Sequence, residues 1–416
     1  MTSFISDYLF NSFTDINEVS NDNPITIVKS DDLNLELSRW KQKLKERDLL
    51  MKDSMYVPSK IQKTISDIGN TFHYLTFNVF SEMAFSYYIY TPYAKALSNT
   101  KLKHYADLIS FLSHFIYDIM VRKMDKGTNK INFKSVHVHI YMTGHKKILP
   151  VKKTTLNADY INTGLTEGYS ETGNIIIFRK EEWYKTLIHE LFHLFGMDQY
   201  TLFDRQNKNV LLNMFNVDSD MRYGEAYVEF WANIVQSALF SYYKHLDNFH
   251  LFKLHFETSM HLELQFSLYQ SNKILNYMVV SYEELYKDVD VGKAHSLTRI
   301  NKKEREKEKK RFHEKTNVFC YYILKTILLY NSNDFFIWCI QHNHNIFKLK
   351  KDDLLYKFFQ KYYDNPSFVK TMNMYKNIQR KHTTNDLYLL RVRDIKKTFK
   401  KNTLRMTILD LPDENV

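Results

Sequence analysis

The sequence predicts an α+β protein that is predominantly helical, with a small sheet near the middle of its 416 residues. Three observations support this fold class. Apolar residues recur at helical spacing on both sides of residues 131–178, whereas within that range the period shortens to two and β-branched residues predominate. A helix with the pattern H-E-x-x-H follows, from His189 to His193. A second helix, rich in glutamate and aromatic residues, begins near Arg222.

Length and composition narrow the class of protein. A chain of this size can bury a large core and hold two or three subdomains. Its two cysteines, Cys320 and Cys339, form no C-x-x-C pattern and support no disulfide framework, which favours a reducing compartment. No stretch is apolar over enough residues to span a membrane, and the N-terminus lacks the basic start of a secretory signal. We therefore expect a cytoplasmic protein.

The net charge of +11 would permit attraction to nucleic acid, an anionic membrane or an acidic substrate. Basic residues are interspersed among acidic ones, however, and no RNP, zinc-finger or P-loop pattern accompanies them. A nucleic acid is therefore not expected as the primary partner. Composition leaves the oligomeric state open.

The first 130 residues are predicted to form an arm and a helical layer. Residues 1–60 are polar and charged, with an exposed helix expected over residues 31–51. After them, apolar spacing predicts two helical segments, one around Phe72 to Met83 and one from Leu108 to Ile119. Both should pack on the central part of the chain.

Residues 131–245 are predicted to hold the sheet and both motif-bearing helices. Ser135–Met142 alternates as a half-buried strand, Tyr160–Thr166 is a candidate edge strand, and Asn174–Phe178 is a short apolar run that suits a buried strand. A loop is expected over residues 198–221.

Two histidines, His137 and His139, point to the same face of the first predicted strand. They could hold a metal. No third ligand follows at a motif-like spacing, so histidines that are exposed or at the edge of the core are the favoured interpretation.

The H-E-x-x-H helix carries the clearest chemistry. Its i, i+4 spacing puts His189 and His193 on one face, roughly 5–6 Å apart, where both imidazoles can bind one metal ion. Glu190 projects beside the ion without binding it, as a general base must to take a proton from a zinc-bound water. Gly196 is expected to end the helix at its C′ position. The alternative is a core helix whose histidines only hydrogen-bond their neighbours.

A third protein ligand is needed, because catalytic zinc takes three and leaves one position open. Glu225 and Glu229 share one face of the second helix amid aromatic residues, a costly place for carboxylates without partners. A surface helix with salt bridges is the alternative. Asp198 and Gln199 lie nearer to the first helix, but Gln199 is a poor zinc ligand and Asp198 is one residue out of the metzincin register.

Residues 246–416 are predicted to form a C-terminal helical region. The run at 301–315 interleaves Lys, Arg and Glu and is expected to be a solvated helix or a linker. The last stretch is expected to be helical and basic, with a positive patch at residues 396–401.

The order of these elements resembles that of zincin metallopeptidases over roughly residues 135–236, and the separate glutamate helix looks like that of the gluzincin branch. Glu225–Ala232 is similar to the helix that carries the third ligand in lethal-factor-like metallopeptidases. Ile175–Asp198 also resembles uncharacterised metallopeptidases of nucleocytoplasmic large DNA viruses. The resemblance implies a zincin-like core, made of a small twisted sheet and the two helices, with helical extensions at both ends.

The resemblance further implies a Zn²⁺ ion held by His189, His193 and Glu225, with Glu229 accepting a hydrogen bond from a ligating imidazole. We therefore expect a zinc-dependent metallopeptidase, a hydrolase and endopeptidase, in which Glu190 is the general base for a zinc-activated water. An extended polypeptide substrate would pair with the edge strand. Tyr223 is the candidate donor to the oxyanion.

The alternative function is a catalytically silent protein that keeps the zincin fold as a structural or interaction module, such as a virion component. An intact H-E-x-x-H weighs against it, since a scaffold does not need Glu190. A viral origin would place the protein in the host cytoplasm or the virion.

Overall fold

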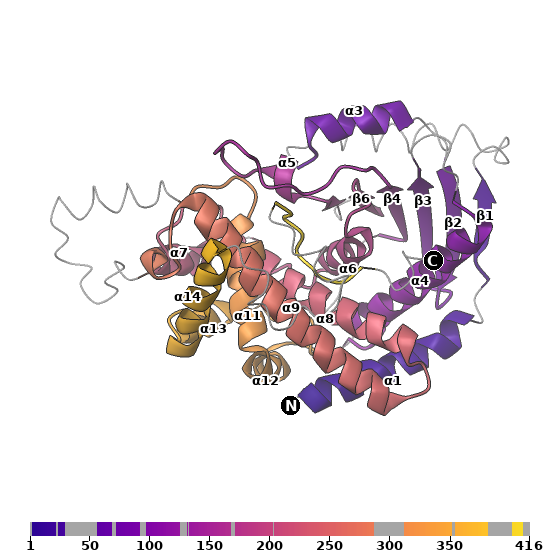
Figure 1. Ribbon diagram of the computed structural model, residues 1–416. Helices are drawn as coiled ribbons and strands as arrows, with labels where there is room; N and C mark the ends of the chain where they lie inside the picture. The colour runs from indigo at the N-terminus through magenta and orange to yellow at the C-terminus, as the bar shows by residue number, and fades with distance from the viewer. Residues whose placement is uncertain are drawn as a thin grey trace.

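The computed structural model describes most of the chain. The described residues are 2–21, 24–29, 56–68, 72–91, 97–124, 131, 133–167, 171–202, 204–286, 312–351, 354–381 and 402–410. Over these residues the fold is α+β and predominantly helical, as predicted, with one sheet standing to one side of a large group of helices (Figure 1). None of the described helices is long and apolar enough to cross a bilayer.

The sheet has six strands in the order β1-β2-β3-β4-β6-β5. β1–β2, β2–β3 and β5–β6 are antiparallel pairs, whereas β3–β4 and β4–β6 are parallel, so the sheet is mixed and β5 forms one edge. The strands are β1 (Thr26–Lys29), β2 (Phe72–Val79), β3 (Met83–Tyr90), β4 (Ser135–Tyr141), β5 (Gly164–Glu167) and β6 (Thr172–Ile177).

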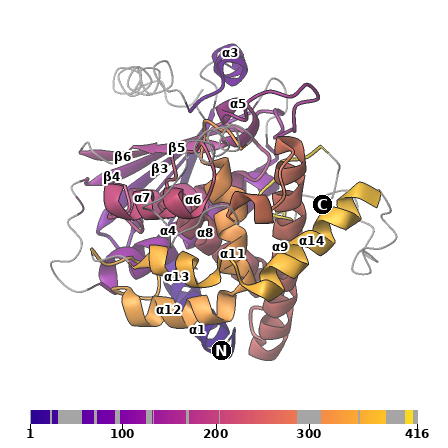
Figure 2. The same ribbon diagram turned by 90° about the vertical axis from the view of Figure 1, so that its left-hand side faces the viewer.

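Helices cover both faces of the sheet. α3 lies on one face, and α4 and α6 lie on the other, with α8, α1 and α9 beyond them (Figures 1 and 2). The bounds are α1 (Thr2–Asn21), α3 (Ser59–Ile68), α4 (Asn99–Tyr117), α5 (Ala158–Ile161), α6 (Trp183–Leu194), α7 (Arg205–Met214), α8 (Gly224–Lys244), α9 (Phe249–Met278), α11 (Lys325–Tyr330), α12 (Ser332–His342), α13 (Leu355–Tyr362) and α14 (Pro366–Lys381). Two π-helical turns, η2 (Asp118–Arg122) and η4 (Phe319–Leu324), and the 3₁₀ turn η3 (Glu283–Leu285) complete them.

The predicted helix around Phe72 to Met83 is wrong. This segment forms β2 and the start of β3, an antiparallel hairpin joined by a short turn at Phe80 and Ser81, both of which have positive φ. Leu75, Phe77 and Val79 point into the core at a period of two. The helical prediction rested on the spacing of Phe72, Leu75, Val79, Phe80 and Met83, whereas the aromatic and β-branched content favours the strand.

The sheet therefore begins before residue 130, and residues 1–130 are not simply an arm and a helical layer. α1 is also not peripheral, because its stripe of Ile5, Leu9, Phe13 and Ile16 is fully buried in the main core. The helix expected over residues 31–51 lies outside the described residues. The predicted helix from Leu108 to Ile119 is confirmed within α4 and η2.

The face of β4 that carries His137 and His139 is covered by α3 and aromatic side chains. The Nδ1 atoms of these histidines lie 3.0 Å from the hydroxyls of Tyr88 and Tyr90, and both residues are buried. They are core histidines on one face, as favoured from the sequence, and they lie outside the cluster described below.

Two further differences concern loops and the C-terminus. The loop expected over residues 198–221 contains α7, whose first turn is capped by the Asp204 carboxylate accepting from the Asn207 backbone N–H at 3.0 Å. Residues 402–410 are extended and largely buried, not helical. The predicted basic patch at 396–401 and most of the charged run at 301–315 lie outside the described residues.

Candidate metal centre

Helix α6 is buried along nearly its whole length and ends where the sequence predicted. Gly196 has a φ of +71°, its N–H donates to the His193 carbonyl at 2.9 Å, and the Met197 N–H donates to the Phe192 carbonyl at 2.9 Å. This pair of bonds is the Schellman motif, in which the left-handed residue favours glycine. The prediction of a C′ glycine at 196 is confirmed.

The turn that follows brings the chain back against the start of α8. Gly224 is the first residue of α8, and a Cβ there would lie 2.6 Å from Oδ2 of Asp198 and would collide with the Thr201 side chain. Glycine at this position allows the α8 N-terminus to approach the loop after α6 closely. That approach carries Glu225, one residue later, to the histidine face of α6.

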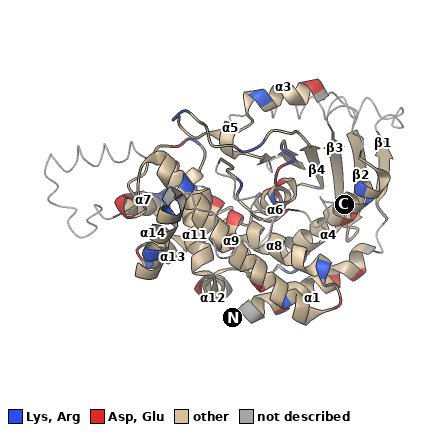
Figure 3. Cartoon of the chain, in the orientation of Figure 1, with Lys and Arg blue, Asp and Glu red and all other residues tan. Residues whose placement is uncertain are grey.

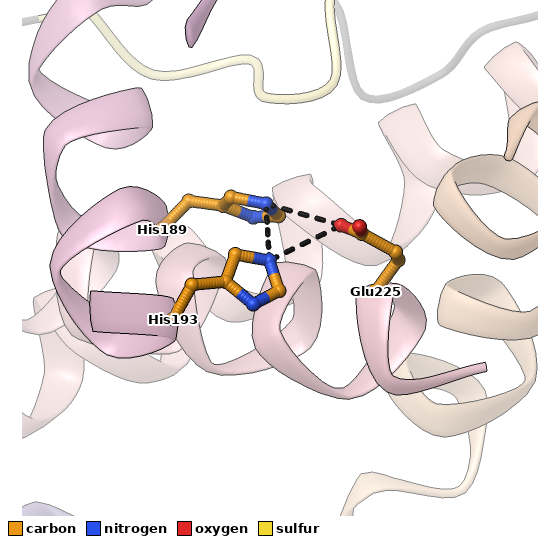
Figure 4. A group of neighbouring side chains, drawn as sticks. All are labelled: His189, His193 and Glu225. Carbon is orange, nitrogen blue, oxygen red and sulfur yellow. Dashed lines mark hydrogen bonds and ion pairs between the residues drawn. The ribbon is translucent and has the colours of Figure 1, made fainter. Parts of the chain in front are cut away.

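The structure brings together His189, His193 and Glu225 (Figure 4). The two Nε2 atoms lie 3.0 Å apart, and Oε2 of Glu225 lies 3.3 Å from that of His189 and 3.2 Å from that of His193. Ligand atoms around a tetrahedral zinc ion lie roughly 3.3 Å apart, because each is about 2.0–2.1 Å from the ion. The spacing of these three atoms therefore fits a single metal ion of that kind.

Each imidazole has a carboxylate behind it. Oε2 of Glu229 lies 3.0 Å from Nδ1 of His189, and Oδ1 of Asp198 lies 2.9 Å from Nδ1 of His193. Carboxylates in these places fix the Nδ1–H tautomer and leave the Nε2 lone pairs for a metal. The other oxygen of Glu229 is paired with the Lys185 ammonium inside the protein. Asp198, considered from the sequence as a ligand, is thus placed to orient His193.

The charges of the cluster favour a cation at its centre. Burial alone would lower the pKa of His193, but Asp198 and Glu225 outweigh it and raise that pKa well above its ordinary value. Hydrogen bonds to Glu225 and Glu229 likewise raise the pKa of His189 against burial. Burial would raise the pKa of Glu225, yet the two imidazoles hold it well below its ordinary range. The donor set thus attracts positive charge, whether a proton or a metal ion supplies it.

Glu190 lies on the side of the cluster that faces the edge strand. Its Oε2 accepts from the Thr166 hydroxyl at 2.6 Å, and burial raises its pKa although both imidazoles oppose this. A Cβ at Gly164, on the same strand, would lie 2.9 Å from Oε1 of Glu190. The edge strand begins later than predicted, at Gly164, because residues 158–161 form the short helix α5.

The structure does not bring Tyr223 to the cluster. Its hydroxyl donates to Oδ2 of Asp204 at 3.0 Å, and the side chain is buried under α7. Tyr321, which the sequence analysis missed, lies there instead. Its ring centroid is 6.1 Å from that of His189, and burial together with the negative charges of Glu225 and Glu190 raises its pKa well above the ordinary value. It belongs to η4, almost a hundred residues after Glu225, and no motif marks it.

A cleft of about 440 Å³ opens over the cluster. The side chains of Glu190, His189, His193, Glu225 and Tyr321 reach it from one side. The edge strand, the turn after α6 and the loop before η4 supply the rest of its wall, through Leu165, Thr166, Gln199, Leu202, Thr316 and Asn317. All the predicted site residues except Tyr223 and Glu229 therefore border one open cleft.

Comparison of the chain with protein-family models, with curated proteins and with solved structures finds no match in any of the three. The resemblance to zincins therefore depends on the motifs and on the geometry of the cluster.

Proposed function

We propose that this chain is a zinc-dependent metallopeptidase of the gluzincin type, with His189, His193 and Glu225 as the metal ligands. The observation that carries the proposal is the convergence of the three ligand atoms, 3.0 to 3.3 Å apart, with Glu190 beside them on an open cleft. A core helix with hydrogen-bonded histidines would explain the pair His189 and His193. It would not explain an unligating carboxylate at 190 that faces the cleft.

The metal ion and the protein side chains would have separate roles in the reaction. Zinc bound by the three side chains would supply Lewis acidity that polarises a peptide carbonyl and makes water a better nucleophile. Glu190 takes a proton from the attacking water as the new C–O bond forms. It then delivers that proton to the amide nitrogen as the C–N bond breaks. The raised pKa of Glu190 suits a group that must accept and release a proton in turn.

A polypeptide in extended form is the substrate that suits this cleft. β5 forms the edge of the sheet and lines the cleft through Gly164, Leu165 and Thr166. Main-chain groups on such an edge can pair with an added strand and carry its scissile bond past Glu190. We propose Tyr321 as the hydrogen-bond donor to the developing oxyanion, because it lines the cleft and its ring stands beside His189.

The alternative is a catalytically silent structural or interaction protein with this fold. It can be told from a peptidase by the metal content and the peptide cleavage of the purified protein. Metal analysis of the purified chain, followed by incubation with a peptide library, separates the two functions. Bound zinc with cleavage that Glu190→Gln abolishes supports the peptidase. Bound zinc with no turnover on any peptide would support the scaffold, and absence of zinc after reconstitution would reject the peptidase.

The compartment is part of the same proposal. Cys320 and Cys339 are both buried and free, which accords with a reducing compartment such as the cytoplasm. Basic and acidic residues are intermixed over the described elements (Figure 3), in keeping with a substrate other than nucleic acid.

A further inference from the structure

Residues 402–410 form an extended segment that runs through the interior of the protein beside α6, as the yellow trace in Figure 1. Leu404, Met406 and Thr407 are buried, although the segment itself forms no helix or strand. Twenty residues, 382–401, separate the segment from the end of α14 along the chain. The segment therefore occupies the fold much as a bound peptide occupies a channel.

Buried lysines bind the carbonyl groups of the segment. The ammonium of Lys273 donates to the Thr403 carbonyl at 2.6 Å, and that of Lys325 donates to the Met406 carbonyl at 2.9 Å. Both lysines are buried, and desolvation lowers the pKa of Lys273 to about 7 and that of Lys325 to about 8. Main-chain acceptors on the segment are thus partners of two buried lysines, whose charged form desolvation disfavours.

Buried glutamates bind the N–H groups. Oε1 of Glu182 accepts from the backbone of Met406 at 2.7 Å and of Thr407 at 2.8 Å. Oε1 of Glu263 accepts from the Ile408 N–H at 3.0 Å. Glu182 also occupies the N-cap position of α6 with a φ of +61°, a conformation that persists in a residue other than glycine only when its surroundings enforce it.

The segment also contacts residues that lie behind the proposed metal ligand His189. The sulfur of Met406 lies 4.0 Å from Nζ of Lys185, the residue paired with Glu229. A small cavity of about 30 Å³ is lined by Met406, Lys185, Glu229 and His189 together. Lys325, held by the Met406 carbonyl, is the second cation whose charge acts on Glu229.

We propose that the channel is a second peptide-binding site, distinct from the metal cleft, and that its occupant, residues 402–410, positions the metal ligand His189. The segment acts through Lys185, which is paired with Glu229 behind His189, and through the charge of Lys325, whose ammonium donates to the Met406 carbonyl. This inference rests on the proposed function, because it assumes that His189 binds zinc.

Removing the segment would leave Glu182, Glu263, Lys273 and Lys325 as buried charges without their main-chain partners. Glu182 would keep its ion pair with Lys147, but each of these buried groups would lose hydrogen bonds that are costly to leave unmade, so the side chains would turn or water would enter. Lys185 would then no longer fix Glu229. Loss of a carboxylate that orients a ligating histidine lowers metal affinity by roughly 10–100-fold.

The test is complementation of a cleaved full chain. A protease site is inserted within residues 382–401, the purified protein is cut there, and the C-terminal fragment is removed by gel filtration. Zinc affinity, and the visible spectrum of bound Co²⁺, are then measured with and without a synthetic peptide of residues 400–412. We expect about a 10–100-fold loss of zinc affinity on removal, and a saturable return of affinity and spectrum with the peptide.

The matched control is the same peptide with Thr407→Pro, which lacks the N–H that donates to Glu182 and should not restore affinity. Unchanged zinc affinity in a folded, cut chain freed of its fragment would overturn the inference. An uncut chain that binds no zinc would instead reject the proposed function.

A second pair of full-chain variants covers the case in which the cut chain unfolds. Lys325→Met should lower zinc affinity and alter the Co²⁺ spectrum, because Lys325 links the segment to Glu229. Lys273→Met removes a similar lysine that binds the segment away from Glu229, and should lower zinc affinity less than Lys325→Met does. Equal effects of the two variants on zinc affinity would show that the segment stabilises the fold in general and does not position His189.

Discussion

Asp198 holds His193 through a 2.9 Å contact between its Oδ1 and the imidazole Nδ1. The Asp198 carboxylate, which could itself have bound a metal, is thus engaged with the imidazole nitrogen of His193 that faces away from the ligand cluster. Glu229 does the same for His189 at 3.0 Å, so both imidazoles are oriented by carboxylates from different segments of the chain.

Replacing Asp198 with asparagine should weaken zinc binding by about 10–100-fold without removing it, since the amide keeps a hydrogen-bonding group beside Nδ1 but loses the charge. Competition with a chromophoric chelator measures the affinity. A complete loss of zinc would indicate that Asp198 is itself a ligand and that the assignment of Glu225 is wrong.

Glu190→Gln should abolish peptide hydrolysis and leave the zinc content near that of the wild type. The amide cannot accept the proton of the attacking water, while Glu190 takes no part in the cluster of ligand atoms. Zinc content by mass spectrometry and turnover on a cleavable peptide are the two readouts. Appreciable turnover by this variant would reject the proposed mechanism.

Substitutions of Glu225 and of Glu229 should have sharply different effects on zinc binding. Glu225→Ala should strip the metal, because it removes one of three ligands. Glu229→Gln, which keeps the volume beside Lys185, should lower zinc affinity by about 10–100-fold only. Metal titration of both variants gives the ranking, and the reverse ranking would exchange the two roles.

The parts of the site that depend on local spacing were predictable from the sequence, whereas the choice of Glu225 as a ligand came from the resemblance to gluzincins. The i, i+4 histidines, the intervening Glu190 and the helix end at Gly196 all follow from helix geometry, and the pairing of Glu225 with Glu229 follows from one turn of α8. From the sequence, Asp198 was considered only as a possible metal ligand. Its contact with His193 was missed because it depends on the path of the turn after Gly196.

Contacts between distant parts of the chain were not predictable in the same way. Tyr321 reaches Glu225 only because η4 packs on α8, and no periodic pattern encodes that packing. The helix expected over the last stretch is wrong for residues 402–410, because lysine and glutamate side chains of other elements bind their backbone groups in place of helical hydrogen bonds. β2 was misread because four apolar residues over so short a window fit two periods.

The pH dependence of the metal-free protein follows from His193. Its pKa in the folded chain lies well above the unfolded value of about 6.5. The stabilisation it provides is therefore fully present below pH 6.5 and is lost as the pH rises through the folded pKa. The Tm of chelator-treated protein should fall over that alkaline range, and zinc binding should release protons there, as calorimetry in buffers of different ionisation enthalpy would detect. Proton release confined to pH values below 6.5 would contradict this account.

Tyr321 and Tyr223 offer a matched pair for the oxyanion donor. Tyr321→Phe removes a hydroxyl that lines the cleft beside the metal ligands, so kcat should fall by about 10²–10³ while KM and zinc content change little. Tyr223→Phe removes a hydroxyl that donates to Asp204, away from the cleft, and should cost about 1 kcal/mol of stability with kcat preserved. Steady-state kinetics and thermal unfolding of the two variants separate these effects. A loss of kcat in Tyr223→Phe with none in Tyr321→Phe would return the role to Tyr223, and would mean that α7 moves when substrate binds.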